Sequence, residues 1–180
     1  YIGSSEFING KMRYCLWMNE KEYQKVSYIQ FLSDKVDAVK KLRLTSTSKS
    51  TVYTADFPYS FAVRGGYDEA YAAFKASGQD EFLQLVVPAV SSESREYVPL
   101  GFVGEDTIVS NRCYVVYNSP IWLLGLLQSK LHMVWLAAIG GKLETRYSYS
   151  SGVVYNTFPV PELSTRRKNM IEEQVFEILD

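Results

Sequence analysis

The sequence predicts an α+β fold that has a mixed or antiparallel sheet, flanking helices and a C-terminal helix. Helical apolar repeats occupy the first quarter and the end of the chain, while the middle consists of short β-branched and aromatic runs separated by Pro and Gly. With 180 residues, 47% of them apolar and 14% aromatic, the chain is long and apolar enough for one packed domain.

The first 44 residues predict a strand followed by one long helix. The run Arg13–Met18 (RYCLWM) favours an extended conformation after the turn signal Asn9-Gly10. From about Asn19 to Leu44, apolar residues recur at steps of three and four, as on one face of a helix: Val26, Ile29, Leu32, Val36 and Val39. Basic residues at its end suit a helix C-terminus, with phosphate contact as the alternative: Lys40, Lys41 and Arg43.

The middle of the chain predicts a connector, a helix and a sheet. Thr45–Thr51 is polar and favours a flexible connector, and Tyr67–Ala76 favours a short helix that ends near Gly78. Four apolar runs then predict strands, because Pro and Gly residues separate them: Phe82–Val87, Tyr97–Val103, Thr107–Val109 and Cys113–Tyr117.

The remainder of the chain predicts two helices with a strand between them. Ser119-Pro120 opens a helix that runs to about Ala138 and stops at Gly140-Gly141. Arg146–Tyr149 favours a strand. Ser164 or Thr165 caps a C-terminal helix with an apolar face: Ile171, Val175 and Ile178.

The cysteines, the histidine and the charge exclude several classes of protein. Cys15, Cys113 and His132 lack the spacing of a metal site, so we predict no metal and two buried free thiols in a reducing cytoplasm. No signal peptide is visible, and polar residues interrupt the most apolar stretch, residues 120–139, so we expect no membrane span. Nineteen Lys and Arg against twenty Asp and Glu give a net charge of −1, without the basic excess of a domain that holds DNA by phosphates alone.

Three segments resemble one protein family. They are YIGSSEFINGKMRYCLW at residues 1–17, SKLHMVWLAAIGGKLETRYSYS at residues 129–150 and YSYSSGVVYNTFPVP at residues 147–161. Their order and separations resemble those of the MmeI-like DNA methyltransferases, which are large bacterial restriction-modification enzymes of type IIG or IIL. The first residues are motif-like and no Met begins the chain, so we expect a piece of a longer polypeptide.

The resemblance implies a non-catalytic DNA-reading module. It implies a DNA target recognition domain over residues 1–161 and the start of a helical segment over residues 162–180, within a cytoplasmic DNA adenine-N6 methyltransferase. The implied partners are double-stranded DNA and the methyltransferase domain of the same polypeptide. S-adenosylmethionine, and Mg²⁺ for cleavage, are implied for the longer protein only. The N-terminal motif is expected to be mostly structural and to join the two domains.

The chain lacks the motifs of catalysis. It has no Pro-Pro pair for the Asn-Pro-Pro-aromatic motif of adenine methyltransferases, and no Asp or Glu two residues before a Lys, as many magnesium-dependent nucleases have. We therefore predict no catalytic residue. A hydrolase that uses His132 with Ser129 or Ser150 is an alternative, although no nucleophile elbow is present and a structural histidine is favoured.

The segment Gly140–Tyr149 (GGKLETRYSY) has the sharpest pattern for reading DNA. If it is extended, Glu144, Arg146 and Ser148 share one face, because side chains on a strand repeat every two residues. A carboxylate beside a guanidinium suits a C·G pair, since Glu accepts from cytosine N4 and Arg donates to guanine N7 and O6. The resemblance implies base-reading side chains in this region. The alternative is an intramolecular surface ion pair.

Further candidates lie in other turns. Asn111 and Arg112 suit adenine and guanine, respectively, and ordinary turn chemistry is the alternative. Arg95 is a candidate backbone or base contact, with an ion pair to Glu93 or Glu96 as the alternative. The remaining candidate backbone contacts are Lys142, Arg64 and Lys49. We expect Arg112, Lys142 and Arg146 to share a positive face, with the acidic residues elsewhere.

Two interpretations remain for the aromatic residues. Tyr147, Tyr149, Tyr155 and Phe158 either stack on an unpaired base or, as we favour, pack the C-terminal helix onto the sheet. An aromatic-rich protein-interaction module without DNA contact is the alternative function, and the neutral charge suits it.

Overall fold

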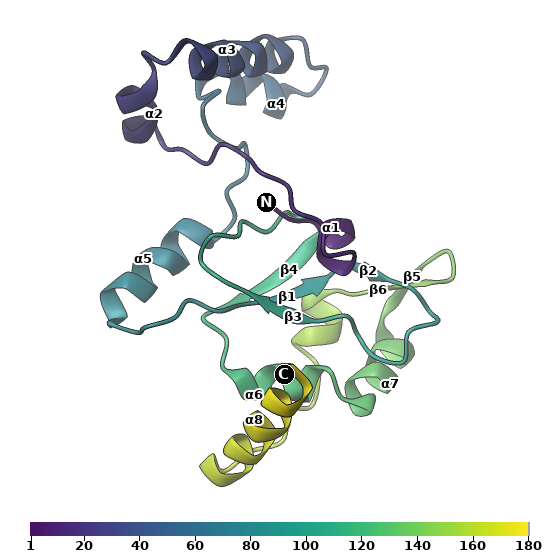
Figure 1. The fold of residues 1–180 in the computed structure, drawn as a ribbon. Coiled ribbons are helices and arrows are strands. Elements are labelled where there is room, and N and C mark those ends of the chain that lie inside the picture. The colour runs from purple at the N-terminus through teal and green to yellow at the C-terminus, as the bar shows by residue number, and fades with distance from the viewer. Residues whose placement is uncertain (180) are drawn as a thin grey trace. The chain divides into compact units, whose positions relative to one another are not determined.

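The computed structural model describes residues 1–179, which form two compact units (Figure 1). The helical unit is Tyr14–Gly65, and the sheet unit comprises Tyr1–Arg13 and the residues from Gly66 onward. Both helices and antiparallel sheets are present, and a helix ends the described chain, which confirms the α+β class.

Two three-stranded antiparallel sheets form the centre of the sheet unit. The first has the order β3-β1-β4, with β1 Gln84–Pro88 between β3 Gly101–Val103 and β4 Cys113–Tyr117. Leu85 pairs with Phe102 on one side and with Val116 on the other. The second has the order β2-β6-β5, from β2 Val90–Ser91, β6 Arg146–Ser148 and β5 Gly141–Leu143.

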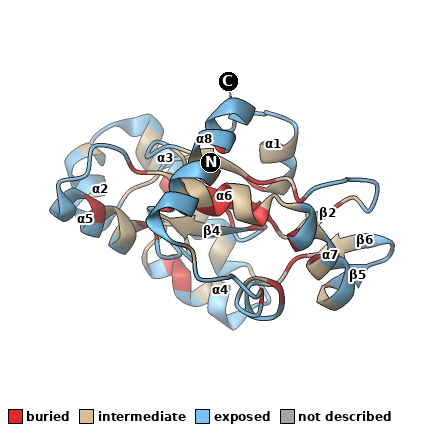
Figure 2. Cartoon of the chain, turned by 90° about the horizontal axis from the view of Figure 1, so that it is seen from below, coloured by how far each residue is buried: buried red, intermediate tan, exposed pale blue. Residues whose placement is uncertain are grey.

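The core of the sheet unit lies between β1 and three helices. α6 Ile121–Leu127, α7 Lys130–Ile139 and α8 Thr165–Leu179 lie together on one side of the sheet in Figure 1. Their apolar faces pack with β1 in one cluster that includes Leu85, Leu124, Leu136 and Val175. Figure 2 shows these buried segments in red along the strands and α6. Burial of this continuous apolar surface is the main contribution to stability.

The single helix predicted over Ser119–Ala138 is two helices in the structure. α6 ends at Leu127, and the Ser129 hydroxyl begins α7 by accepting a hydrogen bond from the His132 main-chain N at 3.3 Å. The predicted stop is confirmed at Gly140. Within residues 1–179 no single helix is long and apolar enough to cross a bilayer; α6 and α7 together have the length and composition but are bent by 58°.

Gly125 allows α8 to lie close to α6. A Cβ atom at residue 125 would lie 2.7 Å from Ile171 Cγ2 and 2.8 Å from Val175 Cγ2. We expect Gly125→Ala to lower the free energy of unfolding by about 1–3 kcal/mol, because overpacking outweighs the helix propensity of alanine. Thermal or urea unfolding measures this. Gly152→Ala is the matched control, since nothing lies within 4 Å of its Cβ position, and an unchanged Gly125→Ala protein would contradict the prediction.

The helix and the four strands predicted for the middle of the chain are confirmed in full or in part. The helix predicted at Tyr67–Ala76 is α5 Tyr67–Ser77, and it ends at Gly78 with φ +70°. The strands predicted around β1 and β4 are confirmed. The strand predicted at Tyr97–Val103 is shortened to β3, which begins after Pro99, because proline lacks an N–H for a sheet. Thr107–Val109 forms only a single parallel bridge, between Ile2 and Val109, because its partner is the short N-terminal segment.

The predicted strand Arg13–Met18 is absent. The chain instead forms α1 Ser4–Ile8, which was not predicted, and residues 11–19 have no regular structure. The Asn9-Gly10 turn is present, with Gly10 at φ +61°, but it follows α1 and does not open a hairpin.

In the helical unit, the predicted single helix is two helices. α2 Glu20–Val26 begins with a capping box between Asn19 and Glu22, and α3 Gln30–Leu44 begins after the extended residue Ile29. α4 Lys49–Tyr53 and a 3₁₀ turn at Thr54–Asp56 follow, so the predicted connector is partly helical.

Arg43 is a structural residue of the helical unit. Its guanidinium donates to the carbonyl oxygens of Thr54 at 2.7 Å, Phe57 at 3.1 Å and Ser60 at 2.7 Å, and desolvation lowers its pKa. These bonds support the structural interpretation over phosphate contact.

Cys15 is half-buried beside an apolar hollow of about 360 Å³, whereas Cys113 of the sheet unit is buried as predicted.

Candidate nucleic-acid interface

Two adjoining hollows lie beside α1 in the sheet unit, and together we call them the α1 groove. The first, of about 520 Å³, contains Arg13, Asn111 and Arg112, and the second, of about 350 Å³, contains Arg95 and Arg146. Both hollows include Ser4, Ser5 and Val90 in their walls. The charged lining residues are four arginines and Glu6, so the groove is positive although the chain carries a net charge of −1. This concentration of guanidinium groups suits an anionic ligand.

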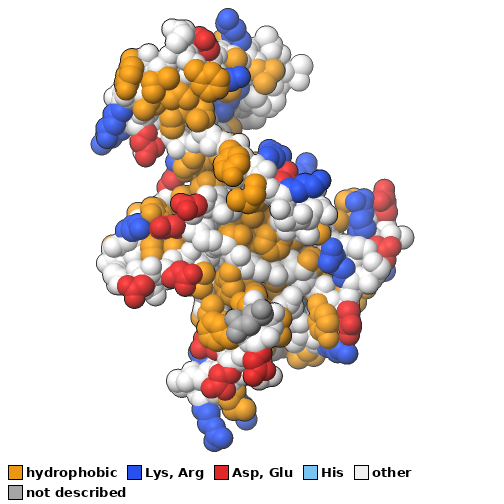
Figure 3. Space-filling view, in the orientation of Figure 1, with side chains coloured by type: hydrophobic (Ala, Val, Ile, Leu, Met, Phe, Trp, Pro, Cys, Tyr) orange, Lys and Arg blue, Asp and Glu red, His pale blue; other side chains and the backbone are white. Residues whose placement is uncertain are grey.

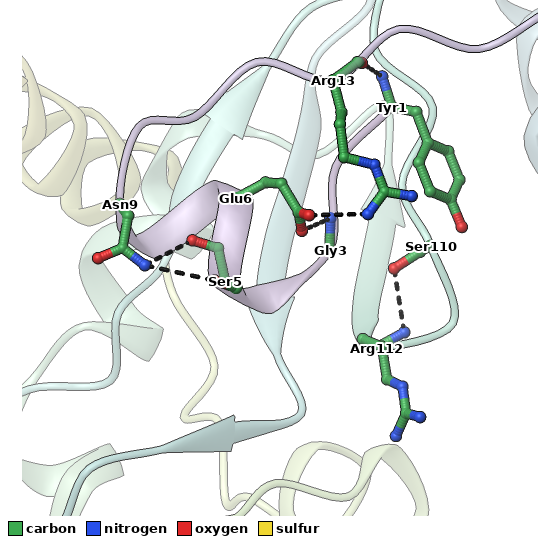
Figure 4. Close-up of polar contacts among 8 residues, drawn as sticks. All are labelled: Tyr1, Gly3, Ser5, Glu6, Asn9, Arg13, Ser110 and Arg112. Atoms are coloured by element: carbon green, nitrogen blue, oxygen red, sulfur yellow. Dashed lines mark hydrogen bonds and ion pairs between the residues drawn. The ribbon is translucent and has the colours of Figure 1, made fainter.

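Asn111 and Arg112 occupy a fixed turn before β4. Ser110 N donates to Ile2 O at 2.8 Å, and Arg112 O accepts from Ala89 N at 3.0 Å and from the Ser4 hydroxyl. The side chains of Asn111 and Arg112 are exposed and form no hydrogen bond or ion pair with another described residue. The backbone is therefore rigid while both side chains remain available to a ligand. Figure 4 shows this turn beside α1.

Glu144 lies in a turn and not on a strand, so the predicted shared face holds only for Arg146 and Ser148. Leu143 pairs with Arg146, which makes Glu144-Thr145 a two-residue hairpin turn, and Glu144 has φ +59°. Its carboxylate still meets Arg146, because Glu144 Oε2 lies 2.8 Å from Arg146 Nη2. Both side chains are exposed. The ion pair of the alternative interpretation is thus present, and it places the two groups side by side.

The hairpin contains acidic as well as basic groups. Glu93 accepts from Thr145 Oγ1 at 3.0 Å, and its pKa is lowered by its own main-chain N–H, by this bond, and by the charges of Arg146 and Lys142. The Lys142 ammonium lies 6.0 Å from the centre of the Tyr147 ring. Figure 3 shows Lys and Arg gathered around α1, mixed charges at the β5–β6 hairpin, and mostly Asp and Glu over α5. The expectation that acidic residues avoid the basic face is therefore wrong at the hairpin.

Arg95 lines the α1 groove and forms no ion pair with its acidic neighbours. Its main-chain N donates to Ser92 O at 3.3 Å, and the side chain lines the second hollow with Arg146. Glu93 is bonded to Thr145, and Glu96 pairs with Lys130 at 3.2 Å. The predicted ion-pair alternative for Arg95 is wrong.

Arg64 and Lys49 belong to the helical unit and line neither hollow. The Arg64 guanidinium donates to Met18 O at 2.8 Å and to Ser60 Oγ at 3.2 Å, and it stacks 4.1 Å from the centre of the Trp17 ring. Lys49 is exposed at the first residue of α4.

His132 is a core residue. Its ring is completely buried, Nε2 lies 3.0 Å from Tyr149 Oη, and Phe158 packs against it at 4.4 Å between ring centroids. Burial lowers the His132 pKa to about 4 and raises the Tyr149 pKa. Ser129 caps α7, so the hydrolase alternative is wrong for this pair.

The aromatic residues also pack inside the protein. Tyr149 and Phe158 are buried in the main core, and Tyr147 and Tyr155 pack against it. Phe158 contacts Trp135 and His132 of α7. The rings therefore pack inside the protein as predicted, but these contacts are with α7, whereas the prediction named the C-terminal helix.

The sequence analysis missed the polar and charged residues that the N-terminal segment contributes to the groove. Arg13, Ser4, Ser5 and Asn9 line it, but the N-terminal motif was interpreted mainly as a joining segment. The available signal was the combination of Ser, Asn and Arg in a segment that carries the resemblance.

Comparison with known proteins identifies the family of this chain. The chain belongs to the family described as "MmeI, target recognition domain", whose model matches residues 1–162. It is 47% identical, over its full length, to DNA methyltransferase A of Bacillus subtilis (strain 168).

A solved structure is also similar. The type IIL restriction-modification enzyme MmeI, determined in complex with DNA, matches 99% of the chain with a TM-score of 0.84 and 33% identity. The chain spans 19% of the Bacillus protein and 22% of the MmeI chain, or about a fifth of each.

Proposed function

We propose that this chain is the DNA-reading part of a restriction-modification methyltransferase that modifies adenine at N6, and that it performs no chemistry itself. The observation that carries the proposal is the α1 groove, which concentrates four arginines in a chain with a net charge of −1. The similarity to MmeI, solved with DNA, supports double-stranded DNA as the ligand.

The residues of the groove and of the β5–β6 hairpin have the chemistry for reading base edges. Asn pairs with adenine N6 and N7, Arg with guanine N7 and O6, and Glu accepts from cytosine N4. We assign base contacts to Asn111 and Arg112 at the fixed turn, and to Glu144, Arg146 and Ser148 at the hairpin. Ser148 is half-buried and has the least freedom to reach a base.

Backbone contacts hold the duplex without reading it. We assign them to Arg95 and Lys142 in the sheet unit, and to Lys49 and Arg64 in the helical unit. Arg64 is the weakest of these, because its guanidinium already binds Met18 and Ser60.

The longer polypeptide supplies the chemistry in this proposal. Its methyltransferase domain uses S-adenosylmethionine, and Mg²⁺ is needed if it also cleaves. Residues 1–161 are the recognition domain, and residues 162–180 begin a further helical segment, in which α8 starts at Thr165. Such an enzyme works in the cytoplasm, where its DNA substrate lies.

The helical unit favours a second, protein-binding role. Several of its large apolar side chains are highly exposed: Tyr14 at 88%, Tyr28 at 82%, Tyr53 at 70% and Phe31 at 66%. Exposed aromatic groups of this kind are typical of protein contacts. We assign this surface to the methyltransferase domain of the same polypeptide. An adaptor without DNA contact is the competing function.

A segment exchange tests the proposal. Residues 1–162 of the full polypeptide are replaced by those of a relative that methylates a different sequence, and modified adenines are mapped by sequencing the DNA of an expressing host. We expect the methylated sequence to follow the exchanged segment. Exchange of α8 alone is the control and should leave the sequence unchanged. If the methylated sequence stays with the rest of the protein, the segment does not read DNA and the adaptor function is favoured.

A further inference from the structure

The first hollow of the α1 groove contains a charged arrangement that neither the motif analysis nor the proposed base contacts include. Arg13 Nη1 lies 2.9 Å from Glu6 Oε1, and Glu6 Oε2 accepts from the main-chain N of Gly3 at 3.0 Å. Glu6 therefore joins the beginning of α1 to the arginine that follows it. Figure 4 shows Glu6 between Gly3 and Arg13, beside the turn that carries Arg112.

Contacts of its main chain and of its side chain hold Arg13 at the wall of the hollow. The Arg13 carbonyl accepts from the amino group of Tyr1 at 2.7 Å, and the guanidinium lies 5.2 Å from the centre of the Tyr1 ring. The Glu6 side chain is only 18% exposed. Hydrogen bonds from main-chain N–H groups are the main cause that lowers its pKa, and Arg13 lowers it less. The carboxylate is thus held in place independently of Arg13 and presents a fixed acceptor to it.

Gly3 permits this close arrangement. A Cβ atom at residue 3 would lie 3.0 Å from both Glu6 Oε2 and Ser110 Oγ. Glu6, and Ser110 in the turn before Arg112, therefore both lie close to the buried Gly3. Arg13 and Arg112 line the same hollow because segments more than 100 positions apart in the sequence contact each other. The hydrogen bond from the Ser4 hydroxyl to Arg112 O is one such contact.

We propose that Arg13 binds a backbone phosphate of duplex DNA in the α1 groove, with Glu6 as its positioning residue. The proposal rests on the proposed DNA-reading function and adds a contact to it. The Arg13 side chain is 61% exposed, and a guanidinium has five N–H donors, of which the bond to Glu6 uses one.

The Arg13 guanidinium keeps donors for a phosphate after it binds Glu6. The bond to Glu6 takes one N–H of Nη1, while Nε and Nη2 keep theirs and form a parallel pair that suits two phosphate oxygens. A phosphate oxygen accepts a single charged donor from many directions. Arg112, which has no acidic partner among the described residues, keeps its whole fork for a base. The two arginines of one hollow thereby divide positioning from reading.

The test is the salt dependence of DNA binding by the full polypeptide that carries this chain. Fluorescence anisotropy with a duplex that contains its methylated sequence gives the dissociation constant at several salt concentrations. Each phosphate contact contributes about 0.9 to the slope of log K against log salt, so Arg13→Gln should reduce the magnitude of that slope by about one. Arg13→Lys keeps the charge and should retain the slope. The methylated sequence should not change in either variant.

Lys75→Gln is the matched control. Lys75 is also an exposed cation of the sheet unit that pairs with a glutamate, since its Nζ lies 3.2 Å from Glu105 Oε2, but it lines neither hollow. This substitution changes the net charge equally and should leave the slope unchanged. Glu6→Gln tests positioning: it should weaken binding while the slope stays close to that of the wild-type protein.

The outcomes separate the two proposals. If the wild-type polypeptide does not bind duplex DNA, the proposed function fails and this inference fails with it. If it binds and Arg13→Gln keeps the wild-type slope, only the phosphate contact is wrong. An equal loss of slope in Lys75→Gln would also overturn it, because the effect would then come from net charge. A lower melting temperature of Arg13→Gln with an unchanged slope would show that Arg13 is only structural.

Discussion

Exchanging the two charges of the β5–β6 hairpin should invert one base pair of the methylated sequence. In the variant with Glu144→Lys and Arg146→Asp, the donor and the acceptor change places, so a C·G preference should become G·C at a single position. Each good contact discriminates by roughly 1–3 kcal/mol, and the two together correspond to roughly 30-fold to 10⁴-fold in preference. Mapping methylated adenines in a host that expresses the full polypeptide measures this.

The ion pair between Glu144 and Arg146 makes the exchange decisive. Glu144 Oε2 and Arg146 Nη2 are 2.8 Å apart, and the exchange preserves an ion pair of this kind as well as the net charge. A purely structural pair therefore predicts full activity on the original sequence, and that result would remove both residues from the reading surface. Arg146→Ala alone should abolish modification, because it leaves Glu144 without a partner. The control is the same exchange at the exposed pair Lys75 and Glu105, which should alter nothing.

The protein should lose about 3 kcal/mol of stability between pH 7 and pH 4 through His132 alone. Its pKa is about 4 in the folded protein, because burial disfavours the imidazolium, and about 6.5 in the unfolded chain. Between these values the unfolded chain binds a proton that the folded protein does not, so the free energy of unfolding rises with pH. The contribution is complete above about pH 6.5 and is lost as pH falls toward 4.

Urea unfolding at several pH values checks this expectation against His132→Gln. The variant removes the titrating group and keeps a polar partner for the Tyr149 hydroxyl, so its stability should depend less on pH. Carboxylates that titrate at the acidic end of this range are common to both proteins, so their contributions cancel in the difference. Since His132 is the single histidine of the chain, its NMR titration is unambiguous. Parallel stability curves for the two proteins, or a folded-state pKa near 6.5, would show that burial does not shift this group.

Local patterns in the sequence predicted where helices form more accurately than where a helix is broken into two. The stop of α7 before Gly140 and the end of α5 at Gly78 follow from chain chemistry within a few residues. The breaks at Ile29 and Ser129 do not, because an apolar stripe that continues in register looks the same whether or not the chain bends between two helices. The failed strand at Arg13–Met18 has a different cause, since a strand also needs a partner, which the sequence does not reveal.

For the candidate site, too, some features could be predicted from the sequence and others required the structure. From the sequence alone we predicted the α+β class, the family resemblance and the chemical types suited to base edges at Asn111, Arg112, Glu144 and Arg146. Only the tertiary structure placed Glu144 in a turn at φ +59°, paired it with Arg146, and added Arg13 to the hollow that contains Arg112. Side-chain type and short periodicities depend on neighbours in the chain, whereas the groove depends on contacts such as Ile2 with Val109, and Ser4 with Arg112, which form only when the whole sheet unit folds.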